Sequence, residues 1–519
     1  MVYDILLLLY FVGVFLGLCL IFRKSGIPFW KALIPVYNIV LWIKICGKDW
    51  KWYIYFLIPA INIFTFLLLV VETAKVFRRY NFWEQTFAVI FPWIYLPALG
   101  FSKLPYFDPK NNPPHKVSEL RDWVDAIVFA LVAAIIIRGK FFELYHIPSS
   151  SMEKTLLVGD RTLVSKYSYG ARVTMTPLSI PLVHNVMPLT GGQVESYLDW
   201  IELPYHRYPG LGSVQRYDAV VFNYPDGDTM CSAQFSNRSY YDLVREYGRE
   251  AVWNDRVVDA SGTPIPIGKI RVRPLDKREN FIKRCIGLPG DTLAIHDQQV
   301  FINGQPLADP SYLQFTYAVL FKPGMGMPRK VLDEMGVSSE DYGNALLQQQ
   351  YMGTPYYMLP LTRQMAQQLS QRYDVADVQP VVFPALDDSR DLFPHDTIHQ
   401  WSVDNYGPIH IPAAGETINL TSENIAIYQR LITSYEHNTL EIRDGQFFIN
   451  GTPTTQYRVR QNYYWMMGDN RHNSADSRYW GFVPEDHILG KFIAVLWSHD
   501  KDHGKIRWNR CFKSIKSFD

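Results

Sequence analysis

The sequence predicts N-terminal transmembrane helices followed by a mainly antiparallel β domain with partly helical insertions. Two observations predict this fold class. Nearly all the long apolar runs lie before Phe142. After His146 the chain changes to short alternating runs separated by Gly, Pro and Asn-Gly turns, which is typical of a β-rich domain. The 519 residues suffice for such a domain, a membrane region and at least one further module.

The first apolar run, Ile5–Phe22, is uncharged and close to the roughly 20 residues that cross a bilayer. Arg23 and Lys24 follow it, whereas a cleaved signal peptide has its basic residues first. We therefore expect a retained anchor with its basic end in the cytoplasm. Tyr53–Val71 and Trp123–Ile137 are predicted as further spans.

Two other apolar stretches, Ile27–Cys46 and Phe87–Phe101, contain prolines, and short spans, re-entrant hairpins and interfacial helices all remain open for them. Lys116 and Arg121 precede the last span, which favours a cytoplasmic start and places everything after His146 on the outer side. Buried core helices are disfavoured because several nearly uncharged stretches of this length occur together. The lipid bilayer is thus an expected partner.

The charge balance and the cysteines exclude several classes of function. Lys+Arg 51 against Asp+Glu 50 gives a net charge of +1, so no global field recruits nucleic acid. The five cysteines are scattered without the spacing of a zinc site or a disulfide framework, although a single Cys231–Cys285 bridge remains open. No metal or organic cofactor is implied.

In the β region, Val300–Leu307 and Gln446–Pro453 share the pattern F-I-N-G-x-P, whose Asn-Gly pairs favour type I′ hairpin turns. Between the β blocks, Arg329–Met352 and Leu361–Tyr373 are predicted to be helical, the second with Thr362 as a possible cap. The Pro- and Asp-rich stretch Asp374–Ala414 is predicted to be a loop.

The first cluster of reactive residues is IPSSSM, Ile147–Met152. Pro148 favours an extended neighbour, and in an extended segment Ser149 and Ser151 point to one face while Ser150 points to the other. One hydroxyl could then attack a carbonyl while its neighbour and a backbone N–H receive the oxyanion. By itself a Ser-rich stretch is more often a loop.

The second cluster is NFIKRCIGLPGD, Asn280–Asp291. Alternation places Phe281, Lys283 and Cys285 on one face of a strand. A lysine between apolar neighbours is a candidate for desolvation, which lowers its pKa and provides the neutral amine that a serine nucleophile needs. The more ordinary interpretation is a lysine at a sheet edge that extends its amine to water.

The third cluster is GDNRHNSADSRYWGFVP, Gly468–Pro484, which is too polar for a core. A solvated loop is the ordinary interpretation. Its many Asp and Asn side chains can bond to the backbone and rigidify it. Arg478 can pair with a carboxylate, and Ser474 can orient a nearby amine.

Together these blocks resemble the characteristic boxes of bacterial type I signal peptidases, the membrane-bound Ser–Lys leader peptidases. IPSSSMEKTLLVGD with KYSYG resembles the nucleophile box, RYDAVVFNYP the next, FIKRCIGLPGD the lysine box and GDNRHNSADSRYWGFVP the last. They occur in the family's order, directly after an apolar run. The resemblance implies a signal-peptidase-like β catalytic domain and the cleavage of signal peptides from exported preproteins.

By this resemblance, Ser151 matches the nucleophile and Lys283 the general base, and Ser149 joins the Ser151 N–H in the oxyanion hole. Ser474 matches a serine that orients the lysine. The resemblance also implies two supporting ion pairs, Asp476 with Arg478 and Arg284 with Asp469. The positions that match the family's shallow substrate pockets are Ile147, Pro148, Met152, Leu156, Phe281 and Ile282.

Three positions depart from the family pattern. Lys154 stands where many members have proline, Tyr217 where an R-G-D triplet has its glycine, and His472 where an aspartate is usual. None of the three is a position matched to a catalytic residue, so the departures affect the expected local geometry and not the expected chemistry. The segments Ala171–Gln215 and Phe301–Tyr463 are additional to the boxes and make the chain an enlarged variant.

The predicted layout is a membrane-embedded region (1–122), an anchor (123–142), a first catalytic β part (143–300), a large inserted β-rich region (301–463) and the last box with the tail (464–519). The expected location is the bacterial cytoplasmic membrane, multi-pass, with the catalytic domain on the outer face. The oligomeric state is left undetermined.

Other classes of function fit less well. A metalloprotease would need a ligand cluster, and His395 and His399 lie in a Pro-bounded loop without H-E-x-x-H. A soluble Ser–Lys self-cleaving repressor would need a helix-turn-helix, and none is evident. The remaining alternative is a catalytically silent membrane scaffold that binds exported chains.

Overall fold

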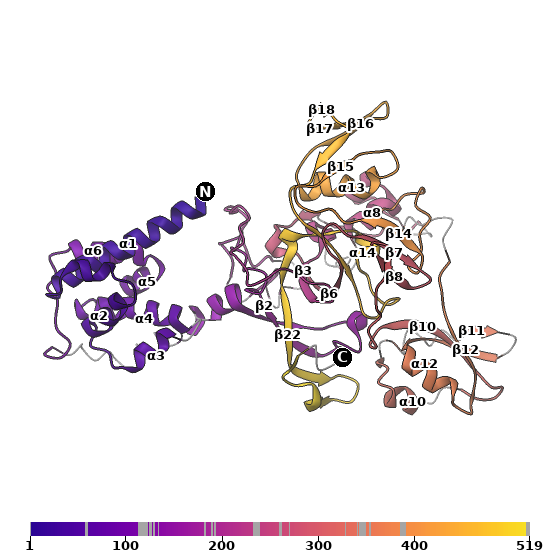
Figure 1. The fold of residues 1–519 in the computed structure, drawn as a ribbon, viewed down its shortest axis with the longest axis horizontal. Coiled ribbons are helices and arrows are strands. Elements are labelled where there is room, and N and C mark those ends of the chain that lie inside the picture. The colour runs from indigo at the N-terminus through magenta and orange to yellow at the C-terminus, as the bar shows by residue number, and fades with distance from the viewer. Residues whose placement is uncertain are drawn as a thin grey trace. The chain divides into compact units, whose positions relative to one another are not determined.

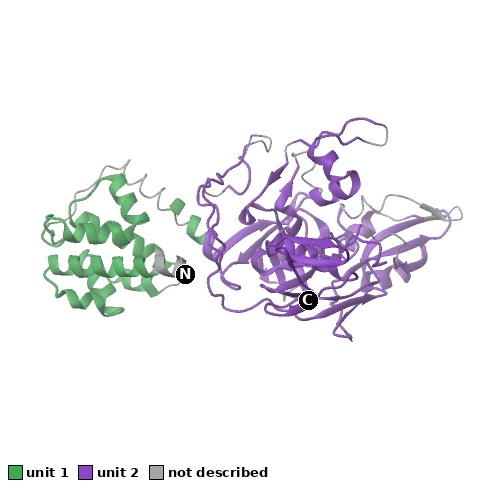
Figure 2. Cartoon of the chain, turned by 90° about the horizontal axis from the view of Figure 1, so that it is seen from above, with its two compact units in different colours: residues 1–137 green, residues 138–519 purple. Residues whose placement is uncertain are grey.

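The computed structural model describes residues 2–57, 61–112, 123, 127, 130–132, 134–180, 183–187, 190, 194–231, 239–258, 262–268, 270–326, 329–339, 341, 349–351, 354–384 and 391–514. The chain forms two compact units, Met1–Ile137 and Arg138–Asp519, which Figure 2 shows in different colours.

The first unit is a group of helices around an apolar core. Its longest helix packs closely on α6 because glycines replace larger side chains at the contact: a Cβ at Gly13 would lie 2.4 Å from the Trp93 carbonyl oxygen. The helices are α1 (Val2–Lys24), α2 (Tyr37–Ile45), α3 (Lys51–Leu57), α4 (Ile61–Val76), α5 (Phe82–Ile90) and α6 (Pro92–Phe101), with a 3₁₀ turn at Phe29–Leu33.

The predicted apolar spans fall differently on these helices. Ile5–Phe22 lies within α1, whereas Tyr53–Val71 is divided between α3 and α4. Phe87–Phe101 is divided between α5 and α6, and most of Trp123–Ile137 lies outside the described residues. Among the described residues, no helix combines the length and the apolarity that crossing a bilayer requires.

The second unit is built on a central antiparallel sheet, as the alternating pattern predicts (Figure 1). The strand order is β1-β2-β22-β3-β6-β20-β21, and β23 and β24 extend the sheet through β22. The strands are β1 (Phe142–His146), β2 (Asp160–Ser165), β3 (Ala219–Asn223), β6 (Asn280–Gly287), β20 (Tyr463–Met467), β21 (Val483–Pro484), β22 (Ile488–Asp500), β23 (Lys505–Ile506) and β24 (Lys513–Ser514).

Strand β6 lies inside this sheet, between β3 and β20. The register pairs Lys283 with Val220 of β3, and Arg284 with Met467 of β20. Apolar residues pack on both faces of the sheet, which buries both basic side chains of β6 to 3% exposure. The strand therefore carries charged groups into the interior of the domain.

The second unit also contains smaller sheets. The two F-I-N-G segments form hairpins with Asn-Gly at the turn, and Asn303, Gly304, Asn450 and Gly451 all have positive φ, which confirms the predicted turns. The strands are β4 (Thr229–Met230), β5 (Arg271–Val272), β7 (Thr292–His296), β8 (Gln299–Ile302), β9 (Gln305–Pro306), β14 (Tyr406–His410), β15 (Thr417–Asn419), β16 (Leu440–Arg443), β17 (Gln446–Ile449), β18 (Thr452–Pro453) and β19 (Gln456–Arg458). Other helices of this unit are α8 (Tyr240–Tyr247), α9 (Arg249–Trp253), α13 (Ile425–Arg430) and α14 (Ser477–Trp480).

Part of the chain between Phe301 and Tyr463 forms a module with its own apolar core. A four-stranded sheet of order β11-β12-β10-β13 packs against a short helix. Its elements are β10 (Gln314–Phe321), α10 (Arg329–Glu334), β11 (Gln349–Tyr351), β12 (Thr354–Thr362), α12 (Arg363–Ser370) and β13 (Val375–Pro380).

The predictions for the inserted region were right in one place and differ from the structure in two. Helix α12 begins where expected, and the Thr362 hydroxyl accepts a hydrogen bond from the Met365 N–H. Of the helix predicted over Arg329–Met352, the structure shows α10, which ends at Glu334, helical conformation again at Ser339 and Asp341, and a strand at Gln349–Tyr351, whereas residues 340, 342–348 and 352 lie outside the described residues. The loop predicted over Asp374–Ala414 contains β13 and β14, which pair with strands distant in the sequence and so leave little local signal.

Candidate active site

The candidate nucleophile lies in a tight turn after β1. Ser149 is extended, with φ −127° and ψ 160°, but Ser150–Met152 form one turn of 3₁₀ helix. The prediction that the extended conformation continues through Ser151 is therefore wrong. The hydroxyls of Ser149 and Ser151 nevertheless approach to 3.5 Å, while Ser150 is buried at 1% exposure. The turn thus produces the division of faces that the sequence predicted, by a different backbone path.

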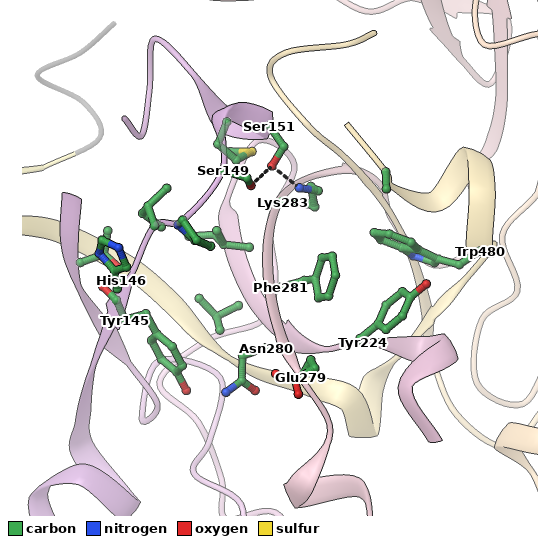
Figure 3. A pocket seen from close by; sticks show the side chains of 17 residues that line it. Tyr145, His146, Ser149, Ser151, Tyr224, Glu279, Asn280, Phe281, Lys283 and Trp480 are labelled. Carbon is green, nitrogen blue, oxygen red and sulfur yellow. Dashed lines mark hydrogen bonds between the residues drawn. The ribbon is translucent and has the colours of Figure 1, made fainter. Parts of the chain in front are cut away.

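Lys283 projects from β6 toward this turn (Figure 3). Its Nζ lies in a hydrogen bond 2.5 Å from Ser151 Oγ and 5.9 Å from the centroid of the Phe281 ring. Burial lowers the pKa of Lys283 to about 8, against the opposing charges of Asp476 and Asp469. A substantial fraction of the amine is therefore neutral near pH 8, and it is in contact with the hydroxyl from which it could take a proton.

Two buried ion pairs fix the loop that follows β20. The Arg284 guanidinium binds both carboxylate oxygens of Asp469, at 2.7 and 2.6 Å. Arg478 binds both oxygens of Asp476, at 2.9 and 2.8 Å. The four side chains are each at most 3% exposed. The residues that the resemblance paired are thus adjacent, and both pairs have the bidentate geometry that orients an arginine most strongly.

Ser474 lies in the same loop, close to the nucleophile turn. A Cβ at Gly468 would be 2.2 Å from Ser474 Oγ and 2.6 Å from the Ser151 carbonyl oxygen, so only glycine permits this packing. The Ser474 hydroxyl donates to the Ala475 carbonyl oxygen at 3.5 Å. No hydrogen bond joins Ser474 to Lys283 in the described part of the chain, so its orienting role stays a prediction.

A cavity of about 580 Å³ opens beside the Ser151–Lys283 pair. Five of the six predicted pocket residues line it, whereas Leu156 lies beneath the turn in the core with Met152. Pattern matching missed an aromatic wall, in which Tyr224 stacks on Phe281 and both meet Trp480 edge-on. The full lining is Tyr145, His146, Ile147, Pro148, Ser149, Ser151, Met152, Thr162, Val221, Tyr224, Glu279, Asn280, Phe281, Ile282, Lys283, Ala475 and Trp480.

The three departures from the family pattern have specific contacts. Lys154 and Tyr217 both adopt left-handed backbone, with φ 72° and 68°. The Lys154 Nζ donates to the Met335 and Gly336 carbonyl oxygens, and the Tyr217 hydroxyl donates to that of Ala308. A glycine would adopt this backbone without strain, which explains why an R-G-D triplet suits the position of Tyr217.

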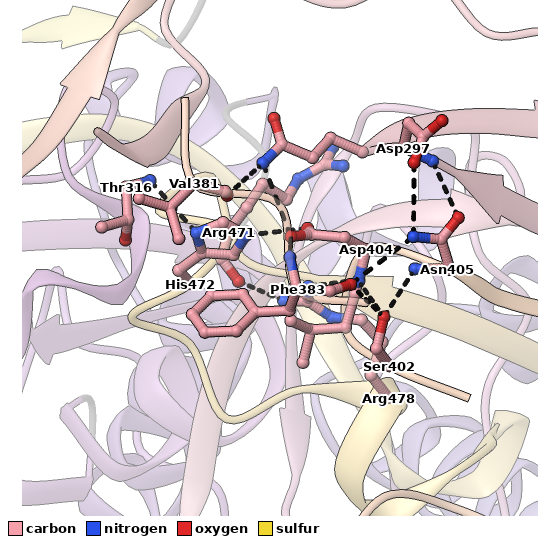
Figure 4. A network of polar contacts seen from close by, with 12 residues as sticks. Asp297, Thr316, Val381, Phe383, Ser402, Asp404, Asn405, Arg471, His472 and Arg478 are labelled. Atoms are coloured by element: carbon pink, nitrogen blue, oxygen red, sulfur yellow. Dashed lines mark hydrogen bonds and ion pairs between the residues drawn. The ribbon is translucent and has the colours of Figure 1, made fainter. Parts of the chain in front are cut away.

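His472, the third departure, lies in a polar network behind the loop (Figure 4). Its Nδ1 accepts a hydrogen bond from the Thr316 N–H at 3.1 Å, so the ring proton belongs on Nε2. The Nε2 lies 2.7 Å from Asp404 Oδ1, and the other oxygen of Asp404 accepts from the Phe383 N–H. The histidine thus joins the last box to two segments of the inserted region.

The sequence of most of the second unit matches the profile of a known family. The family described as signal peptidase, peptidase S26, matches residues 120–342 and 411–497, more than half of the chain. The chain belongs to this family. It is therefore a serine endopeptidase that cleaves signal peptides, and a Ser–Lys dyad is a general property of the family. Residues 30–109 match a second family, DUF5684, of unknown function.

Individual relatives match the chain over different lengths. Signal peptidase I of Buchnera aphidicola subsp. Acyrthosiphon pisum is 24% identical over 385 residues, which cover 73% of this chain and 77% of that protein. Signal peptidase I of Pseudomonas fluorescens is 23% identical over 379 residues, covering 71% of this chain and 69% of that protein. Signal peptidase I of Haemophilus influenzae is 34% identical over 110 residues, which cover 20% of this chain and 30% of that protein.

All five cysteines of this chain are free thiols, so the Cys231–Cys285 bridge does not form.

Sequence reasoning also missed two carboxyl groups behind the nucleophile turn. Glu153 and Asp341 are 3% and 1% exposed. Burial raises the pKa of Glu153 to about 8, and the charge of Asp341 adds to this effect against the cations of Lys154, Arg507 and Arg510. Glu153 lies two residues after Ser151, inside the nucleophile box, so that motif could have drawn attention to it. Asp341 was not, because it belongs to a segment that no motif covers.

We expect the raised pKa of Glu153 to make the protein less stable as the pH rises. Between the ordinary value of 4.5 and about 8, the folded state holds a proton that the unfolded state has lost. The free energy of unfolding therefore falls with increasing pH across this window. Glu153→Gln should flatten the dependence of Tm on pH, measured by circular dichroism, whereas Glu423→Gln at an exposed position should not. Equal slopes in both variants would contradict the assignment.

Proposed function

We propose that this signal peptidase acts through Ser151 as nucleophile and Lys283 as general base. The observation that carries the proposal is the 2.5 Å contact between Ser151 Oγ and a buried amine whose pKa is lowered to about 8. Serine is a weak nucleophile at its own pKa and needs an adjacent base. Among the described residues that line the cavity, two side chains are hydrogen-bonded to the Ser151 hydroxyl, those of Ser149 and Lys283. Of these two, only Lys283 can act as the base.

The reaction follows from this arrangement. Neutral Lys283 takes the Ser151 proton as Oγ attacks the carbonyl carbon at the end of the signal peptide. The ammonium then protonates the leaving amine as the C–N bond breaks, which leaves an acyl-serine. Lys283, neutral again, takes a proton from water as the water oxygen attacks the ester carbonyl carbon. The ammonium returns this proton to Ser151 Oγ as the C–O bond breaks, and the acid leaves as its carboxylate after losing a proton to solvent.

The oxyanion that forms in each attack needs hydrogen-bond donors in place. The Ser149 hydroxyl, 3.5 Å from Ser151 Oγ, and the Ser151 backbone N–H are suited to this role. The Asp476–Arg478 and Arg284–Asp469 pairs support the loop behind the dyad. Ser474 in that loop packs beside the nucleophile turn, at Gly468, and we infer that it orients Lys283.

The first unit attaches the enzyme to the membrane in this proposal, with the catalytic domain on the outer face of the bacterial cytoplasmic membrane. Supporting this, Ile5–Phe22 is uncharged and is followed by Arg23 and Lys24. Leu8, Phe11 and other apolar side chains of α1 are also half or more exposed. Exposed apolar area of this extent is typical of a surface that lipid or another protein covers.

The first test removes the dyad. Ser151→Ala and Lys283→Met should each abolish cleavage of a purified preprotein, because either change leaves no activated nucleophile. Ser370→Ala and Lys330→Met, at exposed positions of the inserted module, are the matched controls and should keep full activity. Circular dichroism should report both dyad variants as folded. Substantial cleavage by either variant would overturn the assignment, and binding without cleavage by the unmodified protein would favour a silent scaffold.

The second test is the pH dependence of kcat/KM. Only the neutral amine can take the Ser151 proton, so kcat/KM should rise with pH through about 8 and level off above it. Phe281→Ala admits water beside the amine and should therefore shift the rise in kcat/KM toward higher pH. If kcat/KM of the unmodified enzyme still rises up to about pH 10, Lys283 is solvated and a different group is the base.

The third test concerns the side chains that the cavity accepts. Its walls near the dyad are built from Ile147, Pro148, Met152, Phe281 and Ile282, and overfilling such a packed site costs roughly 1–3 kcal/mol. We expect a requirement for small residues at the first and third positions before the cut. Phenylalanine at the first position should lower kcat/KM at least about tenfold, or ~1.4 kcal/mol. Cleavage rates indifferent to side-chain size in a substrate panel would contradict this.

A further inference from the structure

The inserted module reaches the residue that precedes the nucleophile. The Ser150 hydroxyl donates to Asp341 Oδ1 at 2.8 Å, and each of the two residues is only 1% exposed. They are 191 positions apart in the chain. Ser150 is the first residue of the 3₁₀ turn that carries Ser151, so a carboxylate from the insertion is bonded directly to the catalytic turn.

The last box closes this contact from the other side. The Asn473 Nδ2 donates both to Ser150 Oγ and to Asp341 Oδ1, each at 2.9 Å. The Asn470 backbone N–H donates to the Ser151 carbonyl oxygen at 3.1 Å, and its side-chain amide donates to that of Ser150 at 3.3 Å. The nucleophile turn is therefore held between the insertion and the last box, with Asp341 Oδ1 as a shared acceptor.

Two further connections hold the module in this place. The Lys154 Nζ donates to the carbonyl oxygens of Met335 and Gly336, at 3.1 and 2.6 Å, shortly before Asp341 in the sequence. At the start of β10, the Gln314 N–H donates to the Asp469 carbonyl oxygen at 3.0 Å, and the Arg471 N–H donates to that of Gln314 at 2.9 Å. The module is thus tied to the catalytic part of the chain at two further places that precede Asp341 in the sequence.

We propose that Asp341 is a positioning residue of the peptidase, which acts through Ser150 to hold Ser151 Oγ against Lys283. The inserted module is then part of the catalytic centre. A single 3₁₀ turn has little internal hydrogen bonding, so its orientation depends on such external contacts. A displacement of about 1 Å at a nucleophile can lower the rate on the order of a hundredfold. This inference depends on the assignment of Ser151 as nucleophile.

The burial of Asp341 fits a fixed role. Desolvation raises its pKa, and the hydrogen bonds from Ser150, Asn473 and Ser338 act in the opposite direction. Its second oxygen, Oδ2, has no hydrogen-bond partner among the described atoms. A carboxyl group kept in so unfavourable a place, with Oδ1 shared between Ser150 and Asn473, is expected where the position of those partners matters.

The test compares Asp341→Ala with Asp333→Ala, which removes the same charge from an exposed site in the same module. We expect Asp341→Ala to lower kcat at least about tenfold with KM within about twofold, because the substrate cavity is untouched while the nucleophile shifts. Asp333→Ala should match the unmodified enzyme. Equal kcat values for the two variants would overturn the proposal.

Two further variants separate positioning from folding. Asp341→Asn keeps an oxygen that can accept from Ser150 and Asn473, so it should recover most of the lost kcat even where Asp341→Ala fails to fold. A loss as large as that of the alanine variant would overturn the proposal. The double variant Ser150→Ala with Asp341→Ala should lose no more kcat than Asp341→Ala alone, because the Asp341 change already removes the contact with Ser150. Losses that multiply would also overturn it.

The same experiments distinguish this inference from the proposed dyad. If Ser151→Ala is inactive and Asp341→Ala behaves as Asp333→Ala, only the positioning role is wrong. If Ser151→Ala retains cleavage, the nucleophile is misassigned, and the positioning role falls with it whatever the Asp341 variants do.

Discussion

Burial of the Lys283 amine is the constraint on which the rest of the site depends, because an amine in water stays protonated at neutral pH and cannot take a proton from Ser151. The fall in its pKa from 10.5 to about 8 corresponds to on the order of 3 kcal/mol against the charged form. That penalty requires a strand buried on both faces. The central position of β6, between β3 and β20, supplies it.

The same interior must hold four more charges without restoring the proton to Lys283. The carboxylates of Asp476 and Asp469 favour the ammonium, whereas the nearby Arg478 disfavours it. Because each carboxylate is bound on both oxygens by an arginine, its field at the amine is partly cancelled and burial dominates. Buried pairs of this kind contribute little net stability. Here they fix the loop and leave the lysine pKa low.

The sequence was sufficient to predict what is encoded locally. The antiparallel β domain, the two Asn-Gly hairpins and the approach of Lys283 to Ser151 follow from alternation, turn chemistry and the order of the boxes. The 3₁₀ turn at Ser150, the strands β13 and β14 and the contact of Asp341 with Ser150 depend on partners far away in the chain. No periodicity or motif near these residues reports such a partner, so sequence reasoning could not find them.

The three departures from the family pattern have a common explanation in these distant contacts. Lys154 bonds to carbonyls beside α10, Tyr217 to that of Ala308, and His472 to Thr316 and Asp404. Every one of these partners lies between Phe301 and Tyr463. Left-handed backbone at Lys154 and Tyr217 is strained for side chains other than glycine, by roughly 1–3 kcal/mol, and needs compensating contacts. The inserted region supplies them. The unusual residues around the dyad are therefore explained by the surface on which the insertion docks, and the chemistry of the dyad does not require them.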